Sequence, residues 1–136
     1  MREYPNMCKA RRQDNNEWIS GFYSIGFKDK FKRHYITEIK EGFTVQHEID
    51  IDTLCRSTGL KDKNDNEIFE NDLVFSKFNS IIRARVIWND EVASFKLYYG
   101  RDIPFGSLDR KFNELVVIGS YLDNLDSKSI FNLINS

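Results

Sequence analysis

The stretch Phe43-Thr44-Val45-Gln46-His47-Glu48-Ile49 shows most clearly which fold this chain adopts. Apolar or ring-bearing side chains alternate in it with polar ones, which is typical of a strand with one buried face. Two segments rich in aromatic and β-branched residues precede it, at residues 18–27 and 34–39, and the polar run Lys28-Asp29-Lys30 connects them. The sequence therefore predicts an antiparallel meander of three strands in its first part.

Similar patterns continue in the second part of the chain. Residues 73–78, 81–88 and 94–99 are predicted as three more antiparallel strands. The apolar run at residues 115–118 predicts another strand, which is buried on both faces or closes a small barrel. This part of the sequence thus predicts a second sheet.

Only the tail shows helical spacing. Ile130, Phe131 and Ile134 fall on one face of a short segment that Asp126 or Ser127 could cap. The predicted fold is therefore mainly β, a β-rich α+β chain. It has an N-terminal antiparallel sheet region, an SH3-like small barrel region and a short C-terminal helix.

Composition and charge narrow the function classes. A chain of 136 residues with 40% hydrophobic content suits a single unit, 1–136, although subdomains 1–55 and 56–136 stay open. The net charge of −1 creates no general attraction to nucleic acid or anionic lipid, so any such binding needs a local patch. No stretch approaches the roughly 18 apolar residues of a membrane span, and the first 16 residues lack the apolar middle of a signal peptide. We expect a cytoplasmic protein without membrane contact, with Cys8 and Cys55 reduced.

Three segments resemble a known family. Residues 57–74, STGLKDKNDNEIFENDLV, resemble the core motif of the YopX family, TGLKDKNGKEIYEGDIV. Residues 85–90, RVIWND, which lead to Phe95, and residues 116–121, VVIGSY, are similar to the V-x-W-like and V-I-G-N-x-Y elements that follow it. Residues 9–23 resemble the R-A-W-D opening and the W-x-x-G-Y-Y segment after it. The resemblance therefore covers most of the chain.

The resemblance implies an origin more than an activity. YopX-like proteins are small, mostly uncharacterised proteins of phages, prophages and plasmids, so it implies a β-rich protein of a mobile element in a bacterial host cell. Arg12 stands where the family's opening has Trp, and the tail lacks the usual N-P-E-L. Asp65 and Asn71 stand where the family has glycine, and because both residue types tolerate positive φ we expect the turns to survive. The motif residues expected to be structural are Gly59, Leu60, Asp62, Lys63, Glu67, Ile68, Asp72, Trp88 and Gly119.

The chain lacks a convincing metal or catalytic motif. Asp62, Asn64 and Asn66 match the first, third and fifth positions of a calcium-binding EF-hand loop, but Glu67 replaces the glycine at the sixth and Leu73 the glutamate at the twelfth. A solvated turn explains them better. A denser acidic set could hold Mg²⁺ or act as acid and base, yet no P-loop or neighbouring histidine accompanies it, which favours exposed turn charges. Its members are Asp50, Asp52, Glu67, Glu70 and Asp72.

The histidines and cysteines also fit neither a zinc site nor a nucleophile. Cys8, Cys55, His34 and His47 have no close paired spacing, and a lone cysteine in a strand-like segment is usually a small apolar residue. A hydrogen-bonded imidazole is the ordinary explanation for His47 on its strand face. We therefore expect no enzyme, no metal and no cofactor.

Binding is the function class that the sequence favours. The leading hypothesis is a phage or prophage accessory protein that binds a protein partner or itself, through exposed strand edges or the aromatic-rich first sheet. An alternative is nucleic-acid binding on a basic sheet face. That face would comprise Arg83, Arg85, Lys96 and Tyr98, beside Tyr99. A metal-dependent hydrolase that uses the carboxylates of residues 50–72 is a third hypothesis. A further basic patch, Lys28, Lys30, Lys32 and Arg33 around Phe31, is interpreted as a solvated connection.

Overall fold

The computed structural model describes residues 7–76, 81–99, 103–107 and 115–123. The chain forms two compact units, Met1–Ser57 and Thr58–Ser136. Each unit contains antiparallel strands and its own hydrophobic core. A mainly β fold is thereby confirmed. No helix among these residues is both long and apolar enough to cross a membrane.

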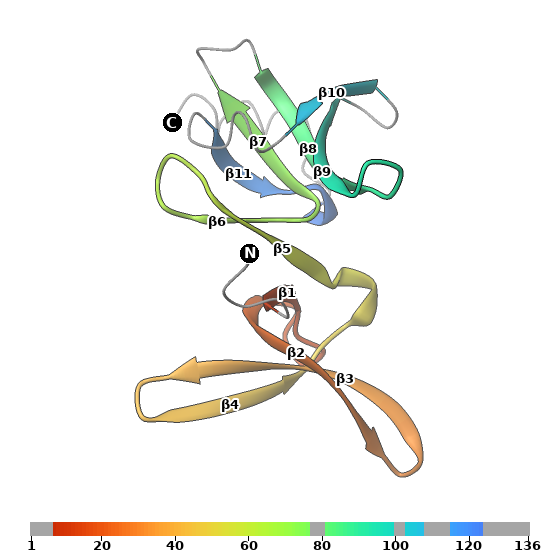
Figure 1. The fold of residues 1–136 in the computed structure, drawn as a ribbon. Helices are drawn as coiled ribbons and strands as arrows, with labels where there is room; N and C mark the ends of the chain where they lie inside the picture. The colour runs from red at the N-terminus through yellow and green to blue at the C-terminus, as the bar shows by residue number, and fades with distance from the viewer. Residues whose placement is uncertain (1–6, 77–80, 100–102, 108–114, 124–136) are drawn as a thin grey trace. The chain divides into compact units, whose positions relative to one another are not determined.

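The first unit is built around a meander. Its strands are β1 (Met7–Arg11), β2 (Trp18–Lys28), β3 (Phe31–Lys40), β4 (Phe43–Glu48) and the beginning of β5 (Cys55–Lys61), with the 3₁₀ turn η1 (Ile51–Thr53) before β5. They pair in the order β4-β3-β2-β1-β5 (Figure 1). The predicted three-strand meander is therefore confirmed as β2, β3 and β4.

The core of the first unit occupies only part of this sheet. Cys8, Ala10, Ile36 and Ile49 are buried together, and Tyr23 packs against them. Strand β3 is the middle strand of the meander, so its turn to β2 lies at one end and its turn to β4 at the other (Figure 1). Both ends of β3 extend past this core. The residues at both turns are exposed. These two hairpin ends carry the surfaces considered below.

The second unit contains the rest of the strands. They are β6 (Glu67–Phe69), β7 (Asp72–Ser76), β8 (Ile81–Asn89), β9 (Ser94–Tyr99), β10 (Ile103–Ser107) and β11 (Val116–Ser120), followed by the 3₁₀ turn η4 (Tyr121–Asp123). The end of β5 pairs with β6, and the other five form a sheet in the order β10-β9-β8-β7-β11. The core contains Ile68, Val74, Ala84, Val86, Leu97 and Leu115.

The second sheet differs from expectation in three ways. Its described strands form an open sheet with β10 and β11 as edges, and no pairing among them closes a barrel. The run at 115–118 is not buried on both faces throughout, because Leu115 is buried but Val116–Ile118 are half-buried, and among the described strands β11 is an edge strand paired with β7. Strand β10 was not predicted, since its sequence IPFGS contains Pro and Gly, which are poor in strands. The predicted C-terminal helix lies outside the described residues.

Candidate functional site

The motif at residues 57–74 contains a turn held by a buried aspartate. Asp62 is only 6% exposed. Its Oδ1 accepts hydrogen bonds from the backbone N–H groups of Asn64 at 2.9 Å and Asn66 at 2.8 Å, and its Oδ2 accepts one from the N–H of Val117 at 2.8 Å. The interpretation as a solvated turn therefore holds for Asn64 and Asn66 and is wrong for Asp62. This carboxylate joins the turn to β11.

A second buried carboxylate closes the next turn. Asp72 is 1% exposed, and its Oδ2 accepts a hydrogen bond from the backbone N–H of Phe69 at 2.8 Å. The interpretation of the acidic set as exposed turn charges is therefore wrong for Asp72. Asp65 and Asn71 have φ values of 67° and 68°, which confirms that both adopt the left-handed backbone expected of them. The motif thus shapes two tight turns.

The remaining motif residues also serve the fold of the second unit. Leu60 packs against the core and Ile68 lies within it. The N–H of Lys63 donates to Leu115 O at 2.8 Å, and the ring of Trp88 meets that of Phe95 edge-on at 5.0 Å. Gly59 has φ 80°, Glu67 begins β6, and Gly119 follows the register shift between β11 and β7.

Three residues of the predicted basic face share one side of the second sheet, but Arg85 is hydrogen-bonded to a neighbouring side chain. Arg85 lies opposite Tyr98, and Ile87 lies opposite Lys96, so Arg85, Tyr98 and Lys96 share one face. The Nε and Nη2 atoms of Arg85 donate to Asn71 Oδ1 at 3.1 and 2.8 Å. These bonds give Arg85 a structural role, and nucleic-acid binding on this face stays a prediction. The side chains of Arg83 and Tyr99 lie outside the described part.

Two further contacts within this unit fix the side chains of Arg85 and Tyr98. The guanidinium carbon of Arg85 stands 3.7 Å from the centre of the Tyr121 ring, which is close enough for a cation–π contact. The hydroxyl of Tyr98 accepts a hydrogen bond from Asn89 Nδ2 at 3.0 Å. Both side chains are therefore held in place without a ligand.

The histidines and cysteines do not form a zinc site or a nucleophile–base pair among the described residues. His34 Nδ1 is 2.6 Å from the Tyr23 hydroxyl, in a hydrogen bond, and the rings stack. Partial burial raises the pKa of Tyr23. Cys8 and Cys55 are both buried, no disulfide joins them, and Cys55 Sγ donates a hydrogen bond to Thr53 O at 3.3 Å. Among the described residues, no group of three or more His, Cys, Asp or Glu side chains could hold a metal ion.

The edge of the first sheet at β4 offers the best candidate site. Among the described strands, β4 pairs only with β3. The backbone N–H of Ile49 donates to His34 O at 3.0 Å, so the backbone of Ile49 points inward to β3, as do those of His47, Val45 and Phe43 by alternation. The backbones of Thr44, Gln46 and Glu48 therefore point outward.

The loop after β1 covers only the end of this edge. Gln13 N–H donates to Glu48 O at 3.0 Å, and Arg12 forms an isolated bridge with Ile49. Both contacts lie beyond Gln46. Within the described part of the chain, the outward-facing backbone groups of Thr44 and Gln46 are thus open to a further strand.

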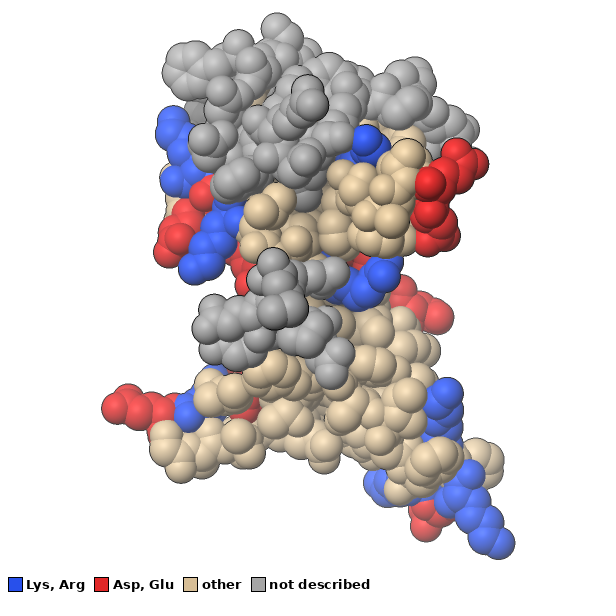
Figure 2. Space-filling view, viewed as in Figure 1, with Lys and Arg blue, Asp and Glu red and all other residues tan. Residues whose placement is uncertain are grey.

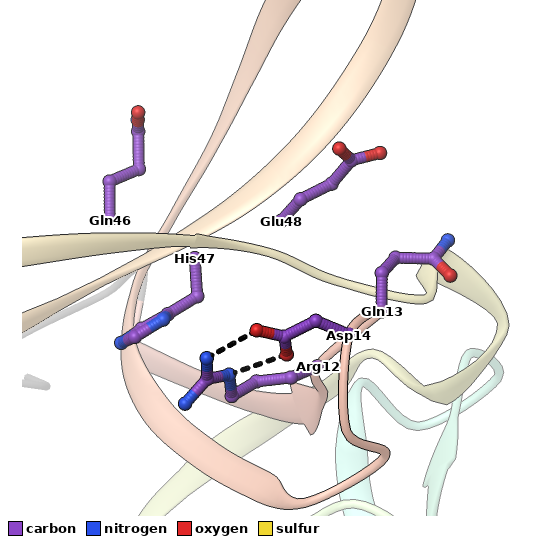
Figure 3. A pocket seen from close by; sticks show the side chains of 6 residues that line it. All are labelled: Arg12, Gln13, Asp14, Gln46, His47 and Glu48. Carbon is purple, nitrogen blue, oxygen red and sulfur yellow. Dashed lines mark hydrogen bonds and ion pairs between the residues drawn. The ribbon is translucent and has the colours of Figure 1, made fainter.

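A polar pocket lies where this loop meets β4. Its volume is about 420 Å³. In Figure 3, Gln46 and Glu48 project from one side of the strand and His47 from the other, toward the guanidinium of Arg12. The lining residues are Arg12, Gln13, Asp14, Gln46, His47 and Glu48.

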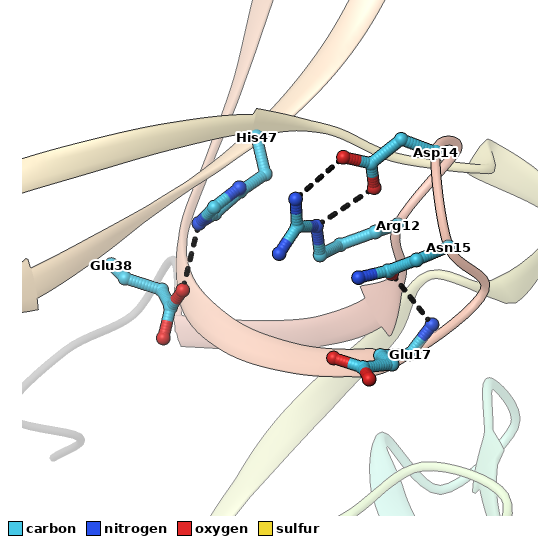
Figure 4. A network of polar contacts seen from close by, with 6 residues as sticks. All are labelled: Arg12, Asp14, Asn15, Glu17, Glu38 and His47. Atoms are coloured by element: carbon cyan, nitrogen blue, oxygen red, sulfur yellow. Dashed lines mark hydrogen bonds and ion pairs between the residues drawn. The ribbon is translucent and has the colours of Figure 1, made fainter.

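The charges around this pocket are largely paired. Arg12 binds Asp14 through two hydrogen bonds, Nε to Oδ1 at 2.9 Å and Nη2 to Oδ2 at 2.5 Å (Figure 4). The hydrogen bond from Arg12 holds the pKa of Asp14 below its ordinary value. His47 Nε2 is 2.8 Å from Glu38 Oε1, so His47 is hydrogen-bonded as expected. The pocket therefore offers polar groups with little free charge.

Sequence reasoning placed the strand but missed this site. The alternation at residues 43–49 indicates a strand and cannot show that its outer side is unpaired. The loop residues Gln13 and Asp14 have no local pattern that would link them to β4, because the contacts join positions more than 30 residues apart in the chain. A useful signal would have been the polar cluster Arg12-Gln13-Asp14 directly after the short strand β1.

These features define a small, mainly β protein of two units with an open sheet edge. The YopX protein family model matches residues 9–125, and the chain therefore belongs to the YopX family. The crystal structure of protein EF1440 from Enterococcus faecalis is similar at 19% identity and a TM-score of 0.49, covering 87% of this chain and 94% of that one. Among curated proteins, none matches this sequence.

Proposed function

We propose that this protein acts by binding another protein, or a second copy of itself, along the outer edge of β4. The observation that supports the proposal is the row of outward-facing backbone groups at Thr44 and Gln46, which no described strand covers. An extended segment of a partner can add a strand to such an edge, because the main-chain hydrogen bonds continue the sheet.

Apolar side chains at the same hairpin strengthen this surface. Ile39 is 66% exposed and Phe43 is 61% exposed, and they flank the turn between β3 and β4 on opposite faces of the hairpin. The nearby Lys40 is paired with Glu38, Nζ to Oε2 at 3.3 Å, so the hairpin end has little net charge around its apolar groups. Such a surface gains free energy when a protein partner removes it from water.

The polar pocket would add selectivity. It lies beside Gln46, toward the covered end of the edge, where a side chain of the added strand can enter. Since Arg12 is paired with Asp14 and His47 with Glu38, the pocket suits a neutral hydrogen-bonding side chain such as Asn, Gln, Ser or Thr. Backbone pairing would supply the affinity for the added strand, and this pocket would supply the selectivity for one of its side chains.

Family membership bears on the biological setting. We propose an accessory protein of a phage or prophage that works in the cytoplasm of the bacterial host and carries out no catalysis. Family membership supports this setting, since the sequence already resembled proteins of mobile elements.

Capture with matched variants tests the edge. Full-length tagged protein is incubated with nuclease-treated host lysate, and bound proteins are identified by mass spectrometry, while light scattering reports self-association. Gln46→Pro removes an outward N–H, and Gln46→Ala shortens the same side chain but keeps that N–H. Proline is tolerated on edge strands, so the fold should survive. We expect the partner or dimer to be lost with Gln46→Pro and kept with Gln46→Ala.

A second pair of variants tests the apolar contribution. Phe43→Ser should weaken capture or dimerisation, whereas Val92→Ser, which removes an apolar side chain that is 55% exposed in the other unit, should not. Capture that survives both Gln46→Pro and Phe43→Ser would contradict the proposal, as would a strictly monomeric protein that captures nothing.

A further inference from the structure

The end of the β2–β3 hairpin is strongly basic and aromatic. We call residues 27–32 the basic tip; its side chains are Phe27, Lys28, Asp29, Lys30, Phe31 and Lys32. Phe27 is 75% exposed and Phe31 is 66% exposed. Within the described part of the chain, Lys28, Lys30 and Lys32 form no ion pair. Blue side chains project over this hairpin end at the lower right of Figure 2.

The register of the hairpin places a ring beside an amine on both of its faces. Phe27 lies directly opposite Lys32, and Lys28 lies directly opposite Phe31. Because side chains alternate across a strand, the first pair projects from one face and the second pair from the other. Lys30 sits in the turn itself, with φ 69°. The tip therefore repeats one aromatic-plus-cation unit on each side of a narrow ribbon.

We propose that the basic tip binds single-stranded nucleic acid. An exposed aromatic ring can stack on an unpaired base of any sequence, and a neighbouring ammonium can pair with the phosphate that follows. Phe27 with Lys32, and Phe31 with Lys28, supply these two contacts on opposite faces, while Lys30 adds charge at the end. Base pairs in a duplex cover their ring faces, so unpaired strands are the better ligand.

An anionic membrane is a less suitable partner for this tip. Asp29 and Lys30 form the outermost part of the turn, beyond both phenylalanines. Inserting the rings into the bilayer would carry these charged groups deeper still, which is costly. The hairpin end at β3–β4 lacks the charge excess, because Lys40 is paired with Glu38 and followed by Glu41. The two ends of β3 are thus chemically distinct, and the two proposals can fail separately.

Fluorescence anisotropy with a labelled oligothymidylate of about 20 nucleotides, long enough for at least one site, tests the proposal. The variant Lys28→Ala/Lys30→Ala/Lys32→Ala should bind more weakly. Its slope of log affinity against log salt, measured between about 50 and 200 mM, should be smaller by about 2, since each phosphate contact on a single strand contributes about 0.7. The variant Phe27→Ser/Phe31→Ser should lose about tenfold or more in affinity and keep the salt slope, because it removes stacking alone.

The variant Val92→Ser serves as the control for the loss of an exposed apolar side chain. It removes a side chain that is 55% exposed in the second unit and should leave oligonucleotide affinity unchanged. Circular dichroism checks that every variant keeps its strands. The proposal is overturned if the wild type does not bind the oligonucleotide, if the lysine variant binds with unchanged affinity and slope, or if a matching duplex binds more tightly. Phe27-dependent binding to phosphatidylserine vesicles without oligonucleotide binding would replace it with a membrane role.

Discussion

Replacing Asp62 should destabilise the second unit far more than its place in a polar turn suggests. Three backbone N–H groups donate to its carboxylate, at 2.8 to 2.9 Å, and the side chain is buried. A hydrogen bond to a charged group is worth about 1.5–3 kcal/mol. In Asp62→Ala, water can replace the acceptor for Asn64 and Asn66, which are exposed, but less well for Val117 in β11. We therefore expect a loss of about 3 kcal/mol in the free energy of unfolding.

The isosteric variant Asp62→Asn gives the sharper comparison. It keeps one acceptor oxygen, but its amide NH₂ must face an N–H donor, either that of Val117 or those within the turn. An amide NH₂ that faces a backbone N–H should lower the free energy of unfolding by about 2 kcal/mol. The free energy of unfolding of a domain is typically about 5–15 kcal/mol, so this loss is readily measured. Urea unfolding followed by Trp88 fluorescence in a Trp18→Phe background reports on the second unit.

The control is Asp65→Asn, the same chemical change three positions further along the turn. Asp65 is exposed, its ion pair with Lys61 spans 3.6 Å, and Asn tolerates its positive φ, so the change should stay below about 0.5 kcal/mol. Equal stabilities for Asp62→Asn and Asp65→Asn would refute the reasoning, because the buried carboxylate would then contribute nothing beyond a surface charge.

Three further predictions concern the first unit. Gly21→Ala should cost about 3 kcal/mol, because the new Cβ would stand 2.2 Å from the carbonyl oxygen of Thr37, and thermal unfolding measures the loss. The hydrogen bond from Arg12 lowers the pKa of Asp14, so the stability that it adds is present above the ordinary pKa of aspartate and is lost as pH falls through the lowered one; NMR titration of Arg12→Gln should show the Asp14 pKa rising back. Lys30→Gly should raise the unfolding free energy by up to about 1 kcal/mol, since φ is 69° there, and a lower melting temperature would contradict this.

Local sequence patterns predicted the strands because each pattern reports on immediate neighbours. Alternation at residues 43–49 predicted the strand β4, which pairs with β3 in the meander. The residue types of Asp65 and Asn71 predicted two turns with positive φ. Local patterns did not predict β10, because its sequence contains Pro and Gly, which are rare in strands. This strand forms through its pairing with β9. Pairing with another strand can thus override a weak local preference.

The roles of charged residues were harder to predict. Asp62 and Asp72 look like surface charges in a polar turn, yet each accepts backbone hydrogen bonds inside the unit. Alternation placed Arg85 on one face of its strand and Tyr98 on one face of the next, but only the strand register shows that the two faces coincide, and nothing in the sequence indicated the bond from Arg85 to Asn71. A sequence shows which groups carry charge, whereas burial and partners depend on segments that fold back from elsewhere in the chain.

The sequence by itself determined the mainly β fold, the family and the tight turns of the motif, since alternation and turn chemistry act over a few residues. Only the tertiary structure decided which strand is left at an edge, and which hairpin end carries Phe27 and Phe31 into solvent beside lysines. It also decided that Asp62 reaches Val117, 55 positions away. These outcomes depend on which strands pair and how far each extends past the core, and that follows from long-range contacts that no local pattern records.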